Sequence, residues 1–332
     1  MLAKRIVNGT VLAVGLAASS VSVAQEPIRV GAAVYGLRAE FMQLWRNAIE
    51  EHPAVKSGEV NVTVFDGRYD ALVQKNQFDT MITQQYDGAV FVPIDAQACA
   101  SPVAKAAGKG IPVVGSNTRC ESDQLASYVG SDDVRAGEMV ANSVIREMGG
   151  SGNVVILEGP IGQSAQVDRA EGIQNVLDNH PNVTVLEKKT AEWSRAQALS
   201  LMENWLTSHR GEIDGVIGQN DEMALGAIQA IESSSEDVED FAIAGVDGVT
   251  DALKAVKAGK MESVLQDARA QAQGALDVVL SGINDDHEPQ SDIWEMYGDR
   301  MSWDGGGKDL YEVPWTPVTE ENVDELLERR SN

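Results

Sequence analysis

The chain has 332 residues, 43% of them hydrophobic, which is enough for two domains with separate cores. Its 51 acidic residues outnumber the 26 basic ones, and the formal net charge at pH 7 is −25. Such an acidic surface repels nucleic acids and anionic lipids, which excludes binding to either as the main function, and the scattered acids indicate adaptation to a saline medium.

The first 24 residues are typical of an export signal. Lys4 and Arg5 precede an apolar stretch over 11–18, and the small residues at 22–24 predict cleavage after residue 24. The apolar stretch is shorter than the roughly 20 residues that span a bilayer. Cleavage would change the net charge from −25 to −27, since this segment holds two basic and no acidic residues. We expect a protein of the periplasm; an ordinary acidic periplasmic protein is the alternative to a salt-adapted one.

Apolar, strand-like runs alternate with helical stretches along the chain, which is the pattern of parallel βαβ units. The first series of runs lies at 28–34, 60–65, 88–92, 112–115 and 127–129. The second series lies at 154–157, 183–187, 215–217, 242–246 and 262–265. Helical spacing of apolar residues predicts helices at 41–51, 134–148 and 195–208. The two series predict an α/β protein with two doubly wound, Rossmann-like lobes, parallel sheets and a cleft between the lobes.

The two cysteines, Cys99 and Cys120, would mature in an oxidising compartment if the chain is exported. A disulfide between them would close a loop of about 20 residues. A catalytic thiol is the alternative, although no histidine lies near either cysteine in the sequence. The four histidines are isolated, and nothing has the spacing of metal ligands. We expect neither a metal nor a cofactor.

Polar residues follow several of the predicted strands. Asn220 and Asp221 follow the run at 215–218, and Asn117 follows the run at 111–116. In an open α/β sheet, small molecules bind beyond the carboxyl ends of the strands. These residues therefore lie where a hydroxylated ligand would be held.

These motifs, with GPIGQSAQVDRAEGI at 159–173, AEWSR at 191–195 and GVDG at 245–248, resemble the ribose-binding type of periplasmic sugar-binding protein across nearly the whole mature chain. The resemblance implies two lobes joined by three crossovers, the first near Ser131. Matching positions carry the family's ligand contacts over to Asn117, Arg169, Trp193, Asn220, Asp247 and either Gln266 or Asp267.

The chemistry of these side chains suits a sugar. An arginine donates from a fixed fork, an indole covers the apolar face of a sugar ring, and a carboxylate accepts strongly from hydroxyls. Each residue also has a structural alternative: Arg169 pairs with an acid on its helix surface, Trp193 belongs to the core, and Asp247 caps a turn or helix.

The first lobe departs most from the family pattern, reading YGLRAEF at 35–41. If Arg38 or Glu40 enters the cleft, the ligand is a sugar acid, an amino sugar or a polyol; otherwise Tyr35 stacks on the ligand beside Phe41. Asp95 is the nearest polar candidate after the third strand. Departures here, at 117–118 and at 267 argue against ribose itself.

We expect a signal peptide at 1–24, an N-terminal lobe of 25–131 plus about 268–297, and a C-terminal lobe of 132–267 plus about 298–332. The function implied is that of a non-enzymatic, monomeric solute-binding protein. It would capture a monosaccharide or sugar alcohol by lobe closure and deliver it to an inner-membrane ABC permease. One alternative is a signalling receptor for a sugar or furanose autoinducer. The other is a sugar-acting enzyme that uses Asp247 and Asp267 as a carboxylate pair.

Overall fold

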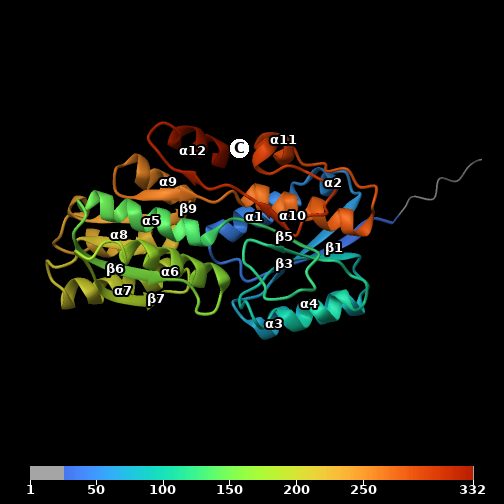
Figure 1. The fold of residues 1–332 in the computed structure, drawn as a ribbon, viewed down its shortest axis with the longest axis horizontal. Helices are drawn as coiled ribbons and strands as arrows, with labels where there is room; N and C mark the ends of the chain where they lie inside the picture. The colour runs from blue at the N-terminus through green and yellow to red at the C-terminus, as the bar shows by residue number, and fades with distance from the viewer. Residues whose placement is uncertain (1–25, 332) are drawn as a thin grey trace, which may run out of the picture.

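A computed structural model describes residues 26–331, so the predicted export signal lies outside the described residues. Two lobes lie side by side, and each contains a six-stranded sheet covered by helices (Figure 1). Within residues 26–331, no helix has the length and apolarity needed to cross a bilayer.

The N-terminal lobe has the strand order β11-β5-β4-β3-β1-β2, and every pair in this sheet is parallel. Its elements are β1 (Ile28–Val34), α1 (Glu40–Glu50), α2 (Pro53–Lys56), β2 (Val60–Asp66), α3 (Ala71–Thr83), β3 (Gly88–Val92), α4 (Ala100–Ala107), β4 (Val113–Ser116), β5 (Ser127–Gly130), α10 (Ala268–Ile283), α11 (Ile293–Tyr297), η2 (Gly298–Arg300) and β11 (Leu310–Glu312).

The C-terminal lobe has the order β12-β10-β9-β8-β6-β7, in which only the short β12 runs antiparallel to its neighbour. Its elements are α5 (Asp133–Glu147), β6 (Gly152–Glu158), α6 (Ser164–Leu177), β7 (Val183–Thr190), α7 (Arg195–Ser208), β8 (Gly215–Gly218), α8 (Asp221–Glu232), η1 (Val238–Asp240), β9 (Ala242–Asp247), α9 (Thr250–Lys257), β10 (Glu262–Leu265), β12 (Thr316–Pro317) and α12 (Val323–Ser331).

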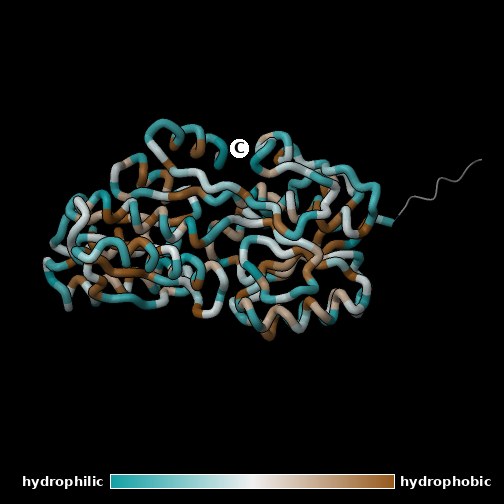
Figure 2. Tube along the Cα trace, viewed as in Figure 1, coloured by the Kyte–Doolittle hydropathy of each residue, from teal (hydrophilic) through white to brown (hydrophobic). Residues whose placement is uncertain are grey.

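All the predicted strands and helices are present. The central strands are buried between helix layers, whereas the edge strands β2 and β7 are only partly buried. The strands β3, β4, β5, β8 and β9 are buried along their whole length. Hydrophobic residues gather on the central strands and inner helix faces, and hydrophilic ones on the outer loops (Figure 2). Polar side chains cap the N-termini of several helices: Asp70 caps α3, Asp132 caps α5 and Ser194 caps α7.

The chain crosses between the lobes three times. The first two crossings follow β5, near Ser131, and β10, at Gln266 and Asp267, as predicted. The third comes later than the expected position near residue 297, because β11 pairs with β5 in the N-terminal sheet. Residues 298–312 therefore belong to the N-terminal lobe. Aromatic packing holds this segment there: Tyr311 is 2% exposed, and its ring centre lies 5.3 Å from that of Trp294.

Candidate ligand-binding site

A small cavity lies between the lobes, at the carboxyl ends of the parallel strands. Eight of the predicted residues line it: Tyr35, Phe41, Asn117, Arg169, Trp193, Asn220, Asp247 and Gln266. Four further residues that the sequence did not predict also line it: Ala39, Thr118, Gln163 and Ala165.

Asp247 presents a buried carboxylate to this cavity. It ends β9 with φ 126°, and its side chain is almost wholly buried. Among the described residues, none donates a hydrogen bond to this carboxylate, and the nearest cation is Arg169, whose Nη1 lies 3.9 Å from Oδ1. Burial raises the pKa of Asp247 well above its usual range, and Arg169 only partly opposes that rise. The carboxylate oxygens therefore remain free to accept from a ligand.

Arg169 is held by groups other than those expected. Its Nε donates to Asp133 Oδ1 at 2.8 Å, and its Nη1 donates to the carbonyl of Gln219 at 2.6 Å. The guanidinium lies 5.6 Å from the ring centre of Trp193. The helix-surface alternative is wrong, because Arg169 is 3% exposed and pairs with an acid at the lobe crossing. This pairing leaves Nη2 for a ligand.

The Trp193 ring is fixed by a hydrogen bond and by close packing. Its Nε1 donates to Gln163 Oε1 at 2.6 Å. Glu192 and Trp193 both have left-handed backbone angles, with φ of 53° and 56°. A Cβ at Gly159 would lie 2.0 Å from the indole, so only glycine leaves room for the ring there. The ring therefore lines the cavity as well as packing in its lobe. Gln163 could have been anticipated from its place just after β6.

Three amide side chains offer donors and an acceptor at the cavity. Asn220 Oδ1 accepts from the N–H of Met223 and caps α8, which leaves Nδ2 as a donor. Asn117 Nδ2 donates to Gln266 Oε1 at 3.2 Å and to Gln271 Oε1 at 3.1 Å, which leaves Oδ1 as an acceptor. Within the described part of the chain, the buried Nε2 of Gln266 has no hydrogen-bond partner. An unpartnered buried donor that faces a cavity indicates a ligand contact.

Asp221 fixes the loop after Asp247. It is fully buried and accepts from the backbone N–H groups of Gly248 and Val249 and from Ser263 Oγ. Burial raises its pKa to about 7.

Two predicted site residues lie outside the cavity lining. Asp267 caps α10 by accepting from the N–H of Ala270, and it also accepts from Tyr297 Oη at 2.7 Å. These donors hold Asp267, and it does not line the cavity that Asp247 faces. Arg38 is exposed and donates to the carbonyl of Glu192. Asp95, the other polar candidate, caps the turn at 97–98.

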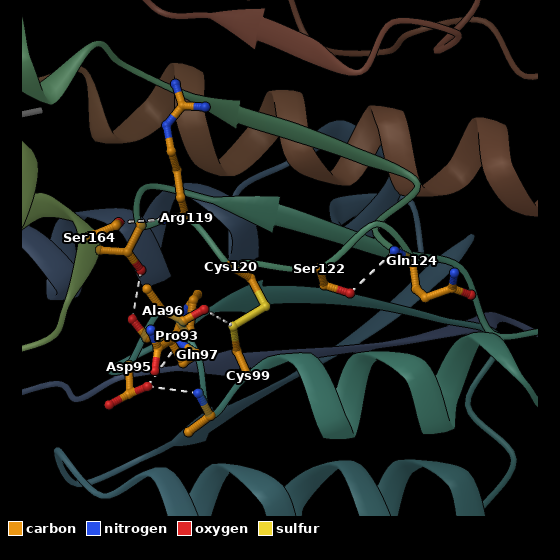
Figure 3. The surroundings of a disulfide bond; sticks show 12 residues. Pro93, Asp95, Ala96, Gln97, Cys99, Arg119, Cys120, Ser122, Gln124 and Ser164 are labelled. Atoms are coloured by element: carbon orange, nitrogen blue, oxygen red, sulfur yellow. Dashed lines mark hydrogen bonds between the residues drawn. A yellow bond between two sulfur atoms is a disulfide. The ribbon is translucent and has the colours of Figure 1, made fainter.

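A disulfide joins Cys99 and Cys120 beside the cleft, with their Cα atoms 5.8 Å apart (Figure 3). The bond fixes the segment that follows Asn117 against the start of α4. From the same segment, the N–H of Arg119 donates to Ser164 Oγ of the other lobe at 2.6 Å. Together with the hydrogen bond from Gln163 Nε2 to the carbonyl of Pro93, this contact shows that the lobes are closed on each other.

Proteins of known structure share this two-lobed architecture. Residues 30–284 match the family described as periplasmic binding protein domain. The chain belongs to this family. Among the described residues of this periplasmic binding protein, no group of three or more His, Cys, Asp or Glu side chains could hold a metal ion.

The chain is similar to several proteins whose names or structures refer to a small-molecule ligand. The chain is 36% identical over 231 residues to the xylitol-binding protein of Mycolicibacterium smegmatis, a match that covers 70% of this chain and 65%, just under two thirds, of that protein. It is 32% identical to the putative rhizopine-binding protein of Rhizobium meliloti, covering 80% of this chain and 88% of the relative. An ABC transporter solute-binding protein from Bacillus halodurans, solved with bound myo-inositol, superposes with a TM-score of 0.79 at 29% identity, covering 92% and 99% of the two chains.

Proposed function

We propose that this periplasmic binding protein captures one monosaccharide or sugar alcohol in the interlobe cavity for import by an ABC transporter. The observation that carries the proposal is the set of unused hydrogen-bonding groups on the cavity wall. These are the carboxylate of Asp247, Nη2 of Arg169, Nδ2 of Asn220, Oδ1 of Asn117 and Nε2 of Gln266. Alternating donors and acceptors around a small cavity match a ring or chain of hydroxyl groups. The indole of Trp193 provides the apolar surface that covers the C–H face of such a ligand.

The charges around the cavity favour a neutral ligand. Arg169 is the only cation that lines the cavity within the described residues, and Asp133 already pairs with it. Asp247 adds a further negative charge. Neither Arg38 nor Glu40 lines the cavity, so the reason for expecting a sugar acid or amino sugar no longer holds. A carboxylate on the ligand would meet Asp247 without a free counter-ion, a juxtaposition that costs several kcal/mol.

The remaining parts of the proposal rest on sequence. The export signal at 1–24 would deliver the protein to the periplasm, and an inner-membrane permease would receive the closed, loaded form. We expect the protein to act as a monomer.

Isothermal titration of the mature protein, purified by refolding to remove bound ligand, tests the proposal. The panel holds xylitol, myo-inositol and ribose, with gluconate and glucosamine as charged controls. We expect one neutral compound to bind with a stoichiometry of one and to be recovered unchanged. Tighter binding of gluconate, conversion of a bound compound, or no binding by any neutral pentose, hexose or polyol in a wider screen would contradict the proposal.

A further inference from the structure

Arg38 reaches across the cleft to the loop that carries Trp193. Its Nη2 donates to the carbonyl of Glu192 at 2.7 Å, and this carbonyl belongs to the residue directly before the indole. The guanidinium also lies over the ring of Tyr69, 4.1 Å from its centre, which fixes the side chain from its own lobe. The arginine therefore connects the first lobe to the loop that presents the stacking ring.

Glu40 makes a second connection across the cleft, to the loop that carries Asp247. Its Oε1 accepts from the N–H of Thr250 at 3.0 Å and from Thr250 Oγ1 at 2.5 Å. Thr250 is the first residue of α9, whose own capping position, Val249, has no side chain that can accept. Glu40 thus caps a helix of the other lobe, where a negative charge is stabilised by the helix dipole.

We propose that Arg38 and Glu40 form an interlobe clasp that stabilises the closed state and positions the two C-terminal loops that hold the ligand. Ala39, between them, lines the cavity, yet neither clasp residue does. The loops they hold contain left-handed residues at Glu192, Trp193 and Asp247. Such backbone conformations persist only where surrounding contacts enforce them. Asp221 and Gln163 supply such contacts from within the C-terminal lobe, and the clasp adds to them when the lobes are closed.

The clasp acts without the ligand, because both of its contacts join protein to protein. We therefore expect the unliganded protein to spend a measurable fraction of its time closed, with the residues that line the cavity already brought together. Loss of a hydrogen bond to a charged group corresponds to about a tenfold change in an equilibrium. Removing either clasp residue should weaken ligand binding by roughly that factor.

Arg38→Ala, Glu40→Ala and the double variant test the clasp, and the double variant keeps the wild-type net charge. Arg210→Ala, at an exposed turn of the C-terminal lobe, and Glu50→Ala, at the far end of α1, are matched controls. Pulsed electron paramagnetic resonance between one label on each lobe gives the closed fraction with and without ligand. Titration with xylitol and myo-inositol gives the affinity. The affinity measurement rests on the proposed ligand class, whereas the distance measurement does not.

We expect the closed fraction to fall in the clasp variants, most in the double variant, and binding to weaken about tenfold for each residue. The two controls should match the wild type. An unchanged closed fraction would overturn the clasp, and so would weaker binding without a change in closed fraction, since that result means a local effect on the cavity. A wild-type protein wholly open without ligand would overturn it as well. If neither compound binds the wild type, the proposed ligands are wrong while the distances still decide on the clasp.

Discussion

Replacing Asp247 with Asn should weaken ligand binding and stabilise the protein at the same time. The amide has the same shape, tolerates the positive φ of 126° and can still accept from hydroxyls, but only as a neutral group. Hydrogen bonds to a charged acceptor contribute about 1.5 to 3 kcal/mol each, against about 1 kcal/mol for neutral ones. For two ligand hydroxyls the loss is about 2 kcal/mol, or about 30-fold in Kd.

The stability change has the opposite sign, because the folded protein buries this charge without a hydrogen bond. Because burial raises the pKa of this carboxyl in the folded protein, its charged form destabilises the fold at pH values above the pKa of the unfolded chain. Arg169 keeps its partner Asp133 in the variant, so no new unpaired cation is created. We expect the free energy of unfolding of the variant to rise, and Tm to rise with it.

Calorimetry of the unliganded variant and titration with the identified ligand measure the two effects. The gain in stability should shrink as the pH falls, because the wild-type carboxyl is then protonated and no longer charged. Wild-type affinity should fall over the same pH range, whereas that of the variant should stay flat. A lower Tm in the variant would mean that Asp247 is a structural cap, and an unchanged Kd would mean that it does not contact the ligand.

Three further predictions concern the frame of the site. Gly159→Ala places a methyl group against the indole of Trp193, and it should abolish ligand binding and cost about 1 to 3 kcal/mol of stability. Tryptophan fluorescence would report the displaced ring. Unchanged affinity would refute this prediction. Replacing both Cys99 and Cys120 with Ser should lower the free energy of unfolding by about 3 kcal/mol, measured by urea denaturation, and an unchanged midpoint would contradict it. The free energy of unfolding should rise as the pH falls from about 7 to about 4, because folded Asp221 takes up a proton that the unfolded chain does not. Asp221→Asn should remove up to about 4 kcal/mol of that rise. Thermal unfolding measured across this pH range checks the prediction.

The sequence predicted the sheets and most of the cavity, because both follow from local pattern and position. Each strand is an apolar run, and Asn117, Asn220 and Asp247 come directly after strands that end at the same edge. The sequence did not predict the direction in which the long side chains at that edge would point. Whether Gln266 or Asp267 faces the cavity depends on where α10 begins, because the helix takes the carboxylate for its own N–H groups.

The other errors arose from contacts between residues far apart in the chain. The third lobe crossing was placed too early because β11 has only three residues and gains its place from pairing with β5, about 180 residues earlier. The opposite-lobe partners of Arg38 and Glu40 are separated from them by 154 and 210 positions. No local pattern marks such partners, since they meet only when the lobes close.

The position of β11 also determines how late in synthesis the first lobe can finish folding. The first lobe begins at the N-terminus, yet its sheet lacks an edge strand until residues 310–312 are available, and its helix α10 comes from residues 268–283. A ribosome that has made the first 260 residues has therefore produced neither lobe in full. Pairings across such separations are slow to form. The emerging chain thus stays unfinished until synthesis is almost over, which is the condition in which a polypeptide can still be threaded through a narrow pore.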